Sequence, residues 1–188
     1  MRPSAPSIRV NRAVAALGRG GVIAYPTESV WGLGCDPANE RAVMRLLALK
    51  NRPVNKGLIL VASALDQLEW LLSGLEGSQY ERLAASWPGP VTWLVPHRNL
   101  VPQWISGDHD TVAVRVSAHV GVSALCQAWG GVLVSTSANP AGSAPALNQL
   151  RIRRYFGNSL DFVVPGDVGV QSRPSSIKDL ISDRTIRQ

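Results

Sequence analysis

The sequence predicts an α/β or α+β fold in which helices pack on a sheet. The first observation is that short apolar runs, typical of buried strands, alternate with segments whose apolar residues recur at helical spacing. The second is a length of 188 residues without an internal repeat or a long linker, which favours one domain spanning residues 1–188. Hydrophobic residues make up 45% and charged residues 17% of the chain, a balance that can bury one core.

Each expected element rests on a local pattern. Helical spacing predicts helices over residues 8–19, 64–72, 79–86 and 120–129, and two more around Val43 and Leu150. Apolar and β-branched runs predict strands over residues 22–25, 58–62, 91–95, 111–117, 132–136 and 162–164, with two short polar strands in the tail. Asn39 and Ser63 are in position to cap the helices that follow them. Residues 100–110 are expected to form an exposed loop.

The basic composition indicates an anionic partner. A net charge of +6 and an isoelectric point near 10 favour a nucleotide, RNA or both. Cys35 and Cys126 are too few for a disulfide framework, and both are expected to be buried thiols in a reducing cytosol. No apolar run approaches the ~20 residues that a membrane helix needs, so a cytoplasmic location without membrane association is expected.

Lysine is concentrated in one loop. The chain has only three lysines among its 19 basic residues, and Lys50 and Lys56 flank Arg52 in the segment L-K-N-R-P-V-N-K-G-L-I-L. Compact ammonium groups on a loop between a helix and a strand suit phosphate binding. A solvated basic turn is the alternative interpretation.

Two other segments carry polar groups at strand ends. Ser135, Thr136, Ser137 and Asn139 follow an apolar run, and their hydroxyl and amide groups could form either an anion cradle or a plain turn. The segment P-T-E-S-V-W-G-L-G-C-D also follows a strand, and its glycines would let the backbone approach a ligand closely. Neither a Walker A loop nor a dinucleotide-binding glycine motif is present.

Arg115 lies inside a β-branched strand, where an unpaired charge would be costly. It is therefore expected to pair either with a carboxylate of the protein or with a carboxylate or phosphate of a ligand. The histidine at position 109 lies in a polar loop whose spacing fits no metal signature, and no metal ligands are assigned. Covalent catalysis has no support, because no Cys/His or Ser/His pairing is visible.

Taken together, the motifs P-T-E-S-V-W-G-L-G-C-D, L-K-N-R-P-V-N-K-G-L-I-L, W-P-G-P-V-T, A-V-R-V and S-T-S-A-N resemble the YrdC/TsaC family of threonylcarbamoyl-AMP synthases in its short form. They occur in family order between about Val22 and Arg187. The resemblance implies a YrdC-like (RibB-like) fold: a twisted, mostly parallel mixed sheet flanked by helices, with a concave basic pocket. It also implies the conversion of L-threonine, bicarbonate and ATP to threonylcarbamoyl-AMP and diphosphate, for tRNA modification.

The resemblance further implies roles for individual residues. Lys50 and Arg52 would be catalytic, and the nucleotide would contact Lys50, Arg52, Lys56, Thr111, Ser137, Asn139 and Arg187. Threonine would contact Thr27, Arg115, Ser135 and Ser175. Mg2+ is expected on the ATP phosphates. Val61 and Pro145 depart from longer relatives, which carry a histidine and a serine at the matching positions.

A non-enzymatic function is the alternative. A double-stranded-RNA-binding or ribosome-maturation module could use the same basic concavity, and Arg151, Arg153 and Arg154 on an expected helix favour RNA contact through a basic face. The lysine loop, Thr27 and Arg115 favour a small-molecule pocket. The two functions are compatible, since a tRNA-pathway enzyme that passes its product to downstream transfer proteins can also touch RNA.

Overall fold

The computed structural model describes residues 7–169 and 175–187. The helices are α1 (Ile8–Gly18), α2 (Glu40–Lys50), α3 (Glu69–Leu72), α4 (Gly77–Ser86), α5 (Gln103–Ser106), α6 (Val120–Trp129) and α7 (Gln149–Phe156), with short 3-10 turns η1 (Val54–Lys56) and η2 (Leu65–Leu68). The strands are β1 (Ile23–Pro26), β2 (Trp31–Gly34), β3 (Ile59–Ala62), β4 (Val91–Pro96), β5 (Thr111–Val116), β6 (Leu133–Ser137), β7 (Phe162–Val163), β8 (Ser176–Asp179) and β9 (Thr185–Arg187). None of the described helices is long and apolar enough to cross a membrane.

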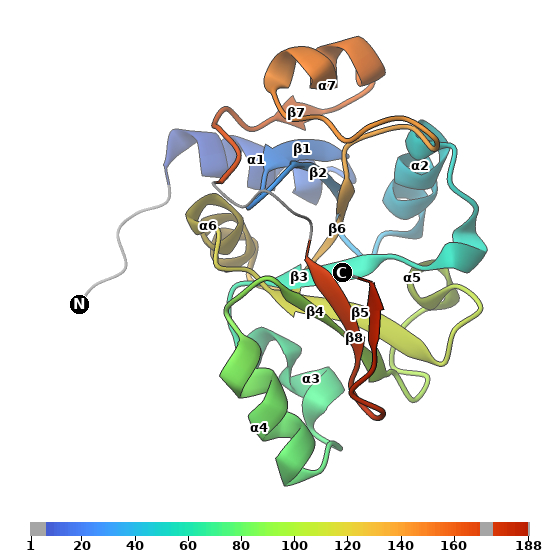
Figure 1. Ribbon diagram of the computed structural model, residues 1–188. Coiled ribbons are helices and arrows are strands. Elements are labelled where there is room, and N and C mark those ends of the chain that lie inside the picture. Colours follow the sequence, from blue (N-terminus) through green and yellow to red (C-terminus); the bar gives the residue numbers. More distant parts are fainter. Residues whose placement is uncertain (1–6, 170–174, 188) are drawn as a thin grey trace.

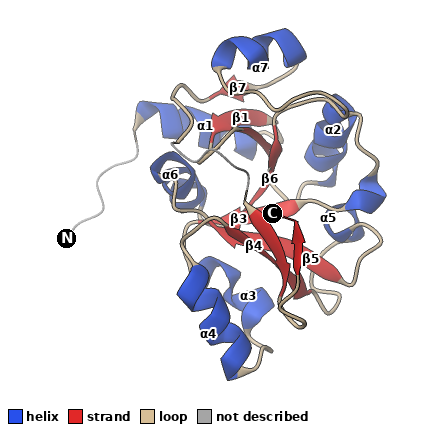
Figure 2. Cartoon of the chain, viewed as in Figure 1, coloured by secondary structure: helices blue, strands red, loops and turns tan. Residues whose placement is uncertain are grey.

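The strands form one mixed sheet in the order β7-β1-β2-β6-β3-β5-β4-β8-β9. The α/β class with flanking helices is confirmed, and Figures 1 and 2 show helices on both sides of the strands. The expectation of a mostly parallel sheet is wrong for the described pairings. Only β1/β7, β3/β5 and β4/β8 are parallel, whereas the other five pairings are antiparallel. Two of these antiparallel pairings, β1/β2 and β8/β9, are hairpins, in which a short turn makes adjacent strands antiparallel.

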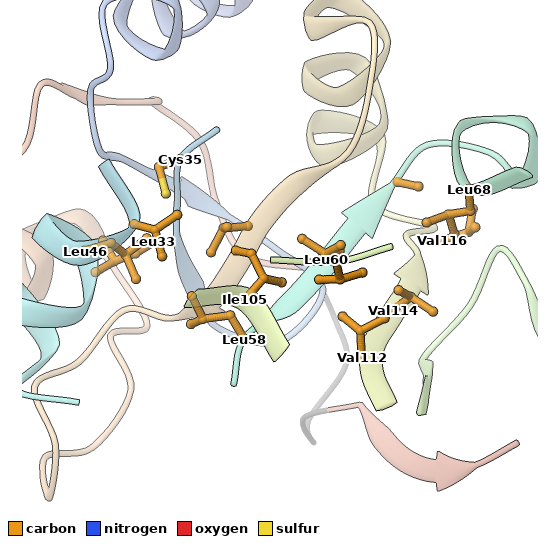
Figure 3. Packing of buried hydrophobic residues seen from close by; sticks show 14 of the residues in the cluster. Leu33, Cys35, Leu46, Leu58, Leu60, Leu68, Ile105, Val112, Val114 and Val116 are labelled. Atoms are coloured by element: carbon orange, nitrogen blue, oxygen red, sulfur yellow. The ribbon is translucent and has the colours of Figure 1, made fainter. Parts of the chain in front are cut away.

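Alternate residues of the strands bury opposite faces of the sheet. Ile23 and Val61 pack with α1 and α6 in one apolar cluster, whereas their neighbours Ala24 and Leu60 belong to the other. The larger cluster takes in α2, α3 and α5, and Figure 3 shows part of its packing around Leu60. A sheet covered on both faces explains why the strands read as continuous apolar runs in the sequence.

Two segments contain regular structure that the sequence did not predict. Residues 31–34 form β2, which pairs antiparallel with β1 and β6 in the middle of the sheet. Its two glycines obscured the strand pattern in the sequence. The loop expected over 100–110 contains α5, and its Val101 and Ile105 are buried, so only part of it is exposed.

Two expected helices differ in detail. The segment 64–72 divides into η2 and α3, and Ser63 caps neither, because its hydroxyl and backbone N–H group both donate to the Gln67 side chain. In α7, Ile152 and Phe156 are buried, whereas Leu150 is exposed. Asn39 caps α2 as expected, since its side chain accepts a hydrogen bond from the Ala42 N–H group at 3.0 Å. Cys35 and Cys126 are buried free thiols, which confirms that expectation.

Gly34 is required by the packing of the sheet. A Cβ atom at this position would lie 2.5 Å from the Val134 carbonyl oxygen and 2.8 Å from the Tyr25 ring. The close approach expected of this glycine is therefore made to the protein itself. Gly32, by contrast, lines the cavity described below.

Gly34→Ala is expected to lower the free energy of unfolding by about 1–3 kcal/mol, because backbone and a buried ring would have to move. Denaturant unfolding measures the change. The matched control is Gly18→Ala at the end of α1, where an added Cβ meets nothing within 4 Å and helix propensity favours alanine. Equal stability of Gly34→Ala and the wild type would contradict the packing argument.

Candidate active site

A cavity of about 510 Å3 opens where the ends of several strands meet. Residues from the β1–β2 turn, from β3, β5 and β6, and from the C-terminal β8–β9 hairpin line it. Four cationic side chains face it: Arg52, Lys56, Arg115 and Arg187. The described lining residues include no aspartate or glutamate, so the cavity is suited to an anionic ligand.

Arg52 is positioned by the loop that follows α2. Asn51 ends that helix in the left-handed conformation, with φ at 50°, and turns the chain toward the cavity. One terminal nitrogen of Arg52 donates to the Gly57 carbonyl at 2.8 Å and to the Lys56 carbonyl at 3.1 Å. Its Nε is buried and has no partner among the described residues. Burial lowers the pKa of this guanidinium.

Lys50 lies beneath the cavity and is not among the residues that line it. It is the last residue of α2 and is buried, with its Nζ donating to the backbone carbonyls of Ser137 and, at 2.8 Å, Asn139. Its own carbonyl accepts from the Ala141 N–H group at 2.7 Å. Burial, with a smaller contribution from the Arg52 charge, lowers the pKa of Lys50 to about 8. Lys50 therefore holds the end of β6 and the loop after it through both its side chain and its backbone carbonyl.

The loop after β6 is shaped by its own polar groups as well. Asn139 donates to the carbonyls of Ser143, at 2.8 Å, and Pro140, at 3.1 Å. Its Oδ1 is buried without a hydrogen-bond partner among the described residues. Ser137 lines the cavity, whereas Asn139 does not. The structure thus brings Ser137 and Arg52 to one cavity and leaves Lys50 and Asn139 behind it.

Arg115 pairs with a carboxylate of the protein and also lines the cavity. Its Nη2 donates to Glu28 Oε2 at 2.9 Å, and Ser117 donates to the other carboxylate oxygen at 2.6 Å. Burial acts to raise the pKa of Glu28, but the Arg115 charge and the Ser117 hydrogen bond outweigh it, and the pKa is lowered. The first of the two expectations for Arg115 is confirmed, and its place in the lining is compatible with the second as well.

The remaining expected residues also line the cavity. They are Thr27, Lys56, Thr111, Ser135, Ser175 and Arg187, together with Val61 and Pro145. Thr27 donates its hydroxyl to the Val30 carbonyl at 2.7 Å, which closes the turn between β1 and β2. Arg187 donates to the Ser175 carbonyl at 3.2 Å, so the last strand is tied to the cavity wall.

Sequence reasoning missed some members of the site. Thr92 lines the cavity and shares a 3.0 Å hydrogen bond with Ser175, and the exposed His109 also contributes to the wall. Glu28 was present in a segment noted for its polar residues, but its pairing with Arg115 joins positions 87 residues apart. The spacing of apolar residues along the sequence carries no information about such a distant contact. Within the described ranges, no group of three or more His, Cys, Asp or Glu side chains is placed to hold a metal ion.

The fold and this cavity define a class: an α/β protein whose basic concavity is built from strand ends, without a glycine-rich phosphate loop. The family model Sua5/YciO/YrdC, described as telomere recombination, matches residues 15–188. The chain therefore belongs to the Sua5/YciO/YrdC family.

Relatives from several bacteria are named threonylcarbamoyl-AMP synthase. The chain is 54% identical to that of Saccharophagus degradans over 179 residues, which cover 95% of this chain and 94% of the relative. It is 55% identical to that of Pseudomonas paraeruginosa over 181 residues, covering 96% and 97%.

Solved structures of the same family share the fold. Sua5 of P. abyssi complexed with L-threonine superposes with a TM-score of 0.84 at 29% identity, over 90% of this chain and 50% of that one. The chain thus spans about half the length of that Sua5. YciO of E. coli gives a TM-score of 0.83 at 26% identity, covering 95% of this chain and 88% of YciO.

Lys50→Met is expected to lower the free energy of unfolding by about 1–3 kcal/mol, because the Ser137 and Asn139 carbonyls of two part-buried hydrogen bonds lose their donor. Urea unfolding measures the effect. Lys56→Ala is the matched control, since Lys56 is exposed and its removal should change stability by less than about 0.5 kcal/mol. If Lys50→Met unfolds like the wild type, the ammonium group does not hold the loop.

Proposed function

We propose that the chain is a threonylcarbamoyl-AMP synthase that converts L-threonine, bicarbonate and ATP to threonylcarbamoyl-AMP and diphosphate. The observation that carries this proposal is the identity of 52% to 55% to relatives of that name, over nearly the full length of both chains. The cation-lined cavity supports it, because the reaction brings a triphosphate and two carboxylate-like groups into one site.

The chemistry requires positioning more than a protein nucleophile. Threonine and CO2 or bicarbonate form a carbamate, and a carbamate oxygen attacks the α-phosphorus of ATP. The bond between the α-phosphorus and its bridging oxygen breaks, and diphosphate leaves. A carbamate decays in water, so the protein must hold both partners close together and stabilise the negative charge of the leaving diphosphate.

The nucleotide is proposed to lie along the side of the cavity formed by the lysine loop and β6. Arg52, Lys56 and Arg187 would face phosphate oxygens, and the hydroxyls of Thr111 and Ser137 would donate further hydrogen bonds. Lys50 and Asn139 would act from behind, where they hold the end of β6 and the loop that follows Ser137.

Threonine is proposed to lie at the other side, against the buried end of β5. Arg115 would bind its carboxylate, with Thr27, Ser135 and Ser175 contacting its polar groups. Val61 is fully buried yet lines the cavity, so it would offer an apolar contact to the threonine methyl group.

Mg2+ is proposed to enter as its complex with ATP. Because the described cavity wall offers hydroxyls and no carboxylate, phosphate oxygens and water would hold the ion. When bound, it would neutralise part of the triphosphate charge. The adenylate would then pass in the cytoplasm to the proteins that transfer the threonylcarbamoyl group to tRNA.

Omission of single substrates tests the proposed reaction. Diphosphate release is expected only when ATP, threonine and bicarbonate are all present, because the adenylate cannot form without the carbamate. A coupled diphosphate assay with each component left out in turn provides the measurement. Release that continues without threonine would contradict the proposal.

RNA contact is a second proposed activity, and the exposed face of α7 supports it. Arg151, Arg153 and Arg154 are all exposed on this helix, which lies at the edge of the fold beside β7 (Figure 1). Such a face would bind phosphates without sequence preference, and its binding would weaken steeply with salt.

Changing Arg151, Arg153 and Arg154 together to alanine is expected to lower RNA affinity and reduce its salt dependence, while adenylate formation stays unchanged. Binding to a double-stranded RNA at several salt concentrations measures the effect. The control removes the same charge from another exposed place, through alanine at Arg9, Arg12 and Arg19. Equal losses in both triple variants would show that net charge, and not the α7 face, governs RNA binding.

A further inference from the structure

Glu28 is a buried carboxylate in the turn between β1 and β2, directly behind the cavity wall. We propose that Glu28 is the positioning residue for Arg115: it orients the guanidinium plane so that the unanchored donors face the carboxylate of the amino-acid substrate. This inference rests on the proposed function and adds a residue that does not itself line the cavity.

Both oxygens of the Glu28 carboxylate are fixed. Oε2 accepts from Arg115 Nη2 at 2.9 Å, and Oε1 accepts from the Ser117 hydroxyl at 2.6 Å. The Ser117 oxygen in turn accepts from the His119 N–H group at 3.1 Å, and His119 is the N-cap of α6. A chain of hydrogen bonds therefore connects the start of a packed helix to the guanidinium in the cavity wall.

The turn that carries Glu28 is also held in place. The backbone N–H group of Thr27 donates to the Val30 carbonyl at 3.0 Å, and the Thr27 carbonyl accepts from the Gly169 N–H group at 2.8 Å. Gly169 lies so close that an added Cβ would stand 2.7 Å from the Glu28 carbonyl oxygen. The carboxylate thus projects from a rigid turn, which is the support that a positioned charged group requires.

The planarity of arginine makes this anchoring effective. A guanidinium presents five N–H donors in one fixed plane, so an anchor at Nη2 sets the direction of the others. Among the described residues, Glu28 is the acceptor that the structure assigns to the Arg115 side chain. The remaining edge of the plane can then meet a ligand carboxylate through two parallel hydrogen bonds.

Neutralisation of a buried charge is the competing role for Glu28. An isolated guanidinium in this nearly dry position would be costly, and any nearby anion would relieve that cost. The two roles make opposite predictions for two conservative variants. Position depends on the length of the side chain, which Glu28→Asp shortens, whereas neutralisation depends on its charge, which Glu28→Gln removes.

Steady-state kinetics of threonylcarbamoyl-AMP formation, with threonine and ATP titrated separately, distinguish the roles. Glu28→Asp is expected to raise the KM for threonine by at least about 10-fold and to leave the KM for ATP within about 3-fold. Glu28→Gln can still accept from Arg115 and donate to Ser117. It is expected to keep the KM for threonine at or below the wild-type value, since it also removes an anion near the bound carboxylate.

Two further variants complete the test. Ser117→Ala removes the brace on Oε1 but keeps the ion pair, so it should raise the KM for threonine by about 3- to 10-fold. It serves in place of Glu28→Asp if that variant does not fold. Arg45→Ala is the control, because it removes the exposed Arg45–Asp161 ion pair, which lies outside the cavity wall.

Each outcome has a distinct meaning. If Glu28→Gln weakens threonine binding more than Glu28→Asp does, Glu28 acts as a counter-charge and the positioning role is overturned. Unchanged threonine dependence in Glu28→Asp or, where that variant does not fold, in Ser117→Ala overturns it as well. A wild-type protein that forms no adenylate would instead refute the proposed function, and the inference with it.

Discussion

The structure depends on keeping several positive charges close together around one cavity. Arg52, Lys56, Arg115 and Arg187 converge there, and like charges at short range raise the free energy of the empty site. Three of these side chains donate to acceptors of the protein: Arg52 to backbone carbonyls, Arg115 to Glu28 and Arg187 to the Ser175 carbonyl. An anionic ligand would compensate the positive charge of the lining, so the cavity is suited to such a ligand.

Those acceptors also connect the cavity to the rest of the fold. Lys50 joins α2 to the loop after β6, because its side chain and its backbone carbonyl both bond to that loop. Glu28 and Ser117 likewise connect the β1–β2 turn to the start of α6. A cavity held in this way is preorganised, so its cationic side chains need little rearrangement to meet an anionic ligand.

The sequence predicted which residue types form the site better than it predicted the direction in which each residue faces. Most strands and helices could be expected from periodicity, and most of the contact residues implied by the family resemblance do line the cavity. The orientation of Lys50 could not be predicted. A lysine at the end of a helix can point to solvent or to a neighbouring loop, and the apolar pattern of the helix is the same in both cases. Likewise, Gly34 was expected to approach a ligand, whereas it approaches Val134 and Tyr25. The proportion of antiparallel pairings was missed because strand patterns do not record the direction of the partner.

The site is completed by the last part of the chain. β8 pairs with β4 in parallel, so that Ser176 lies opposite Val91, and β9 folds back on β8 to bring Arg187 to the cavity. Ser175 reaches Thr92 in the same way, across 83 residues of sequence. Both contacts join segments that are distant in the sequence, and non-local contacts of this kind are associated with slower folding. Because Arg187 belongs to the β8–β9 hairpin and Arg52 to the loop after α2, the cavity acquires its full charge only when both segments are in place.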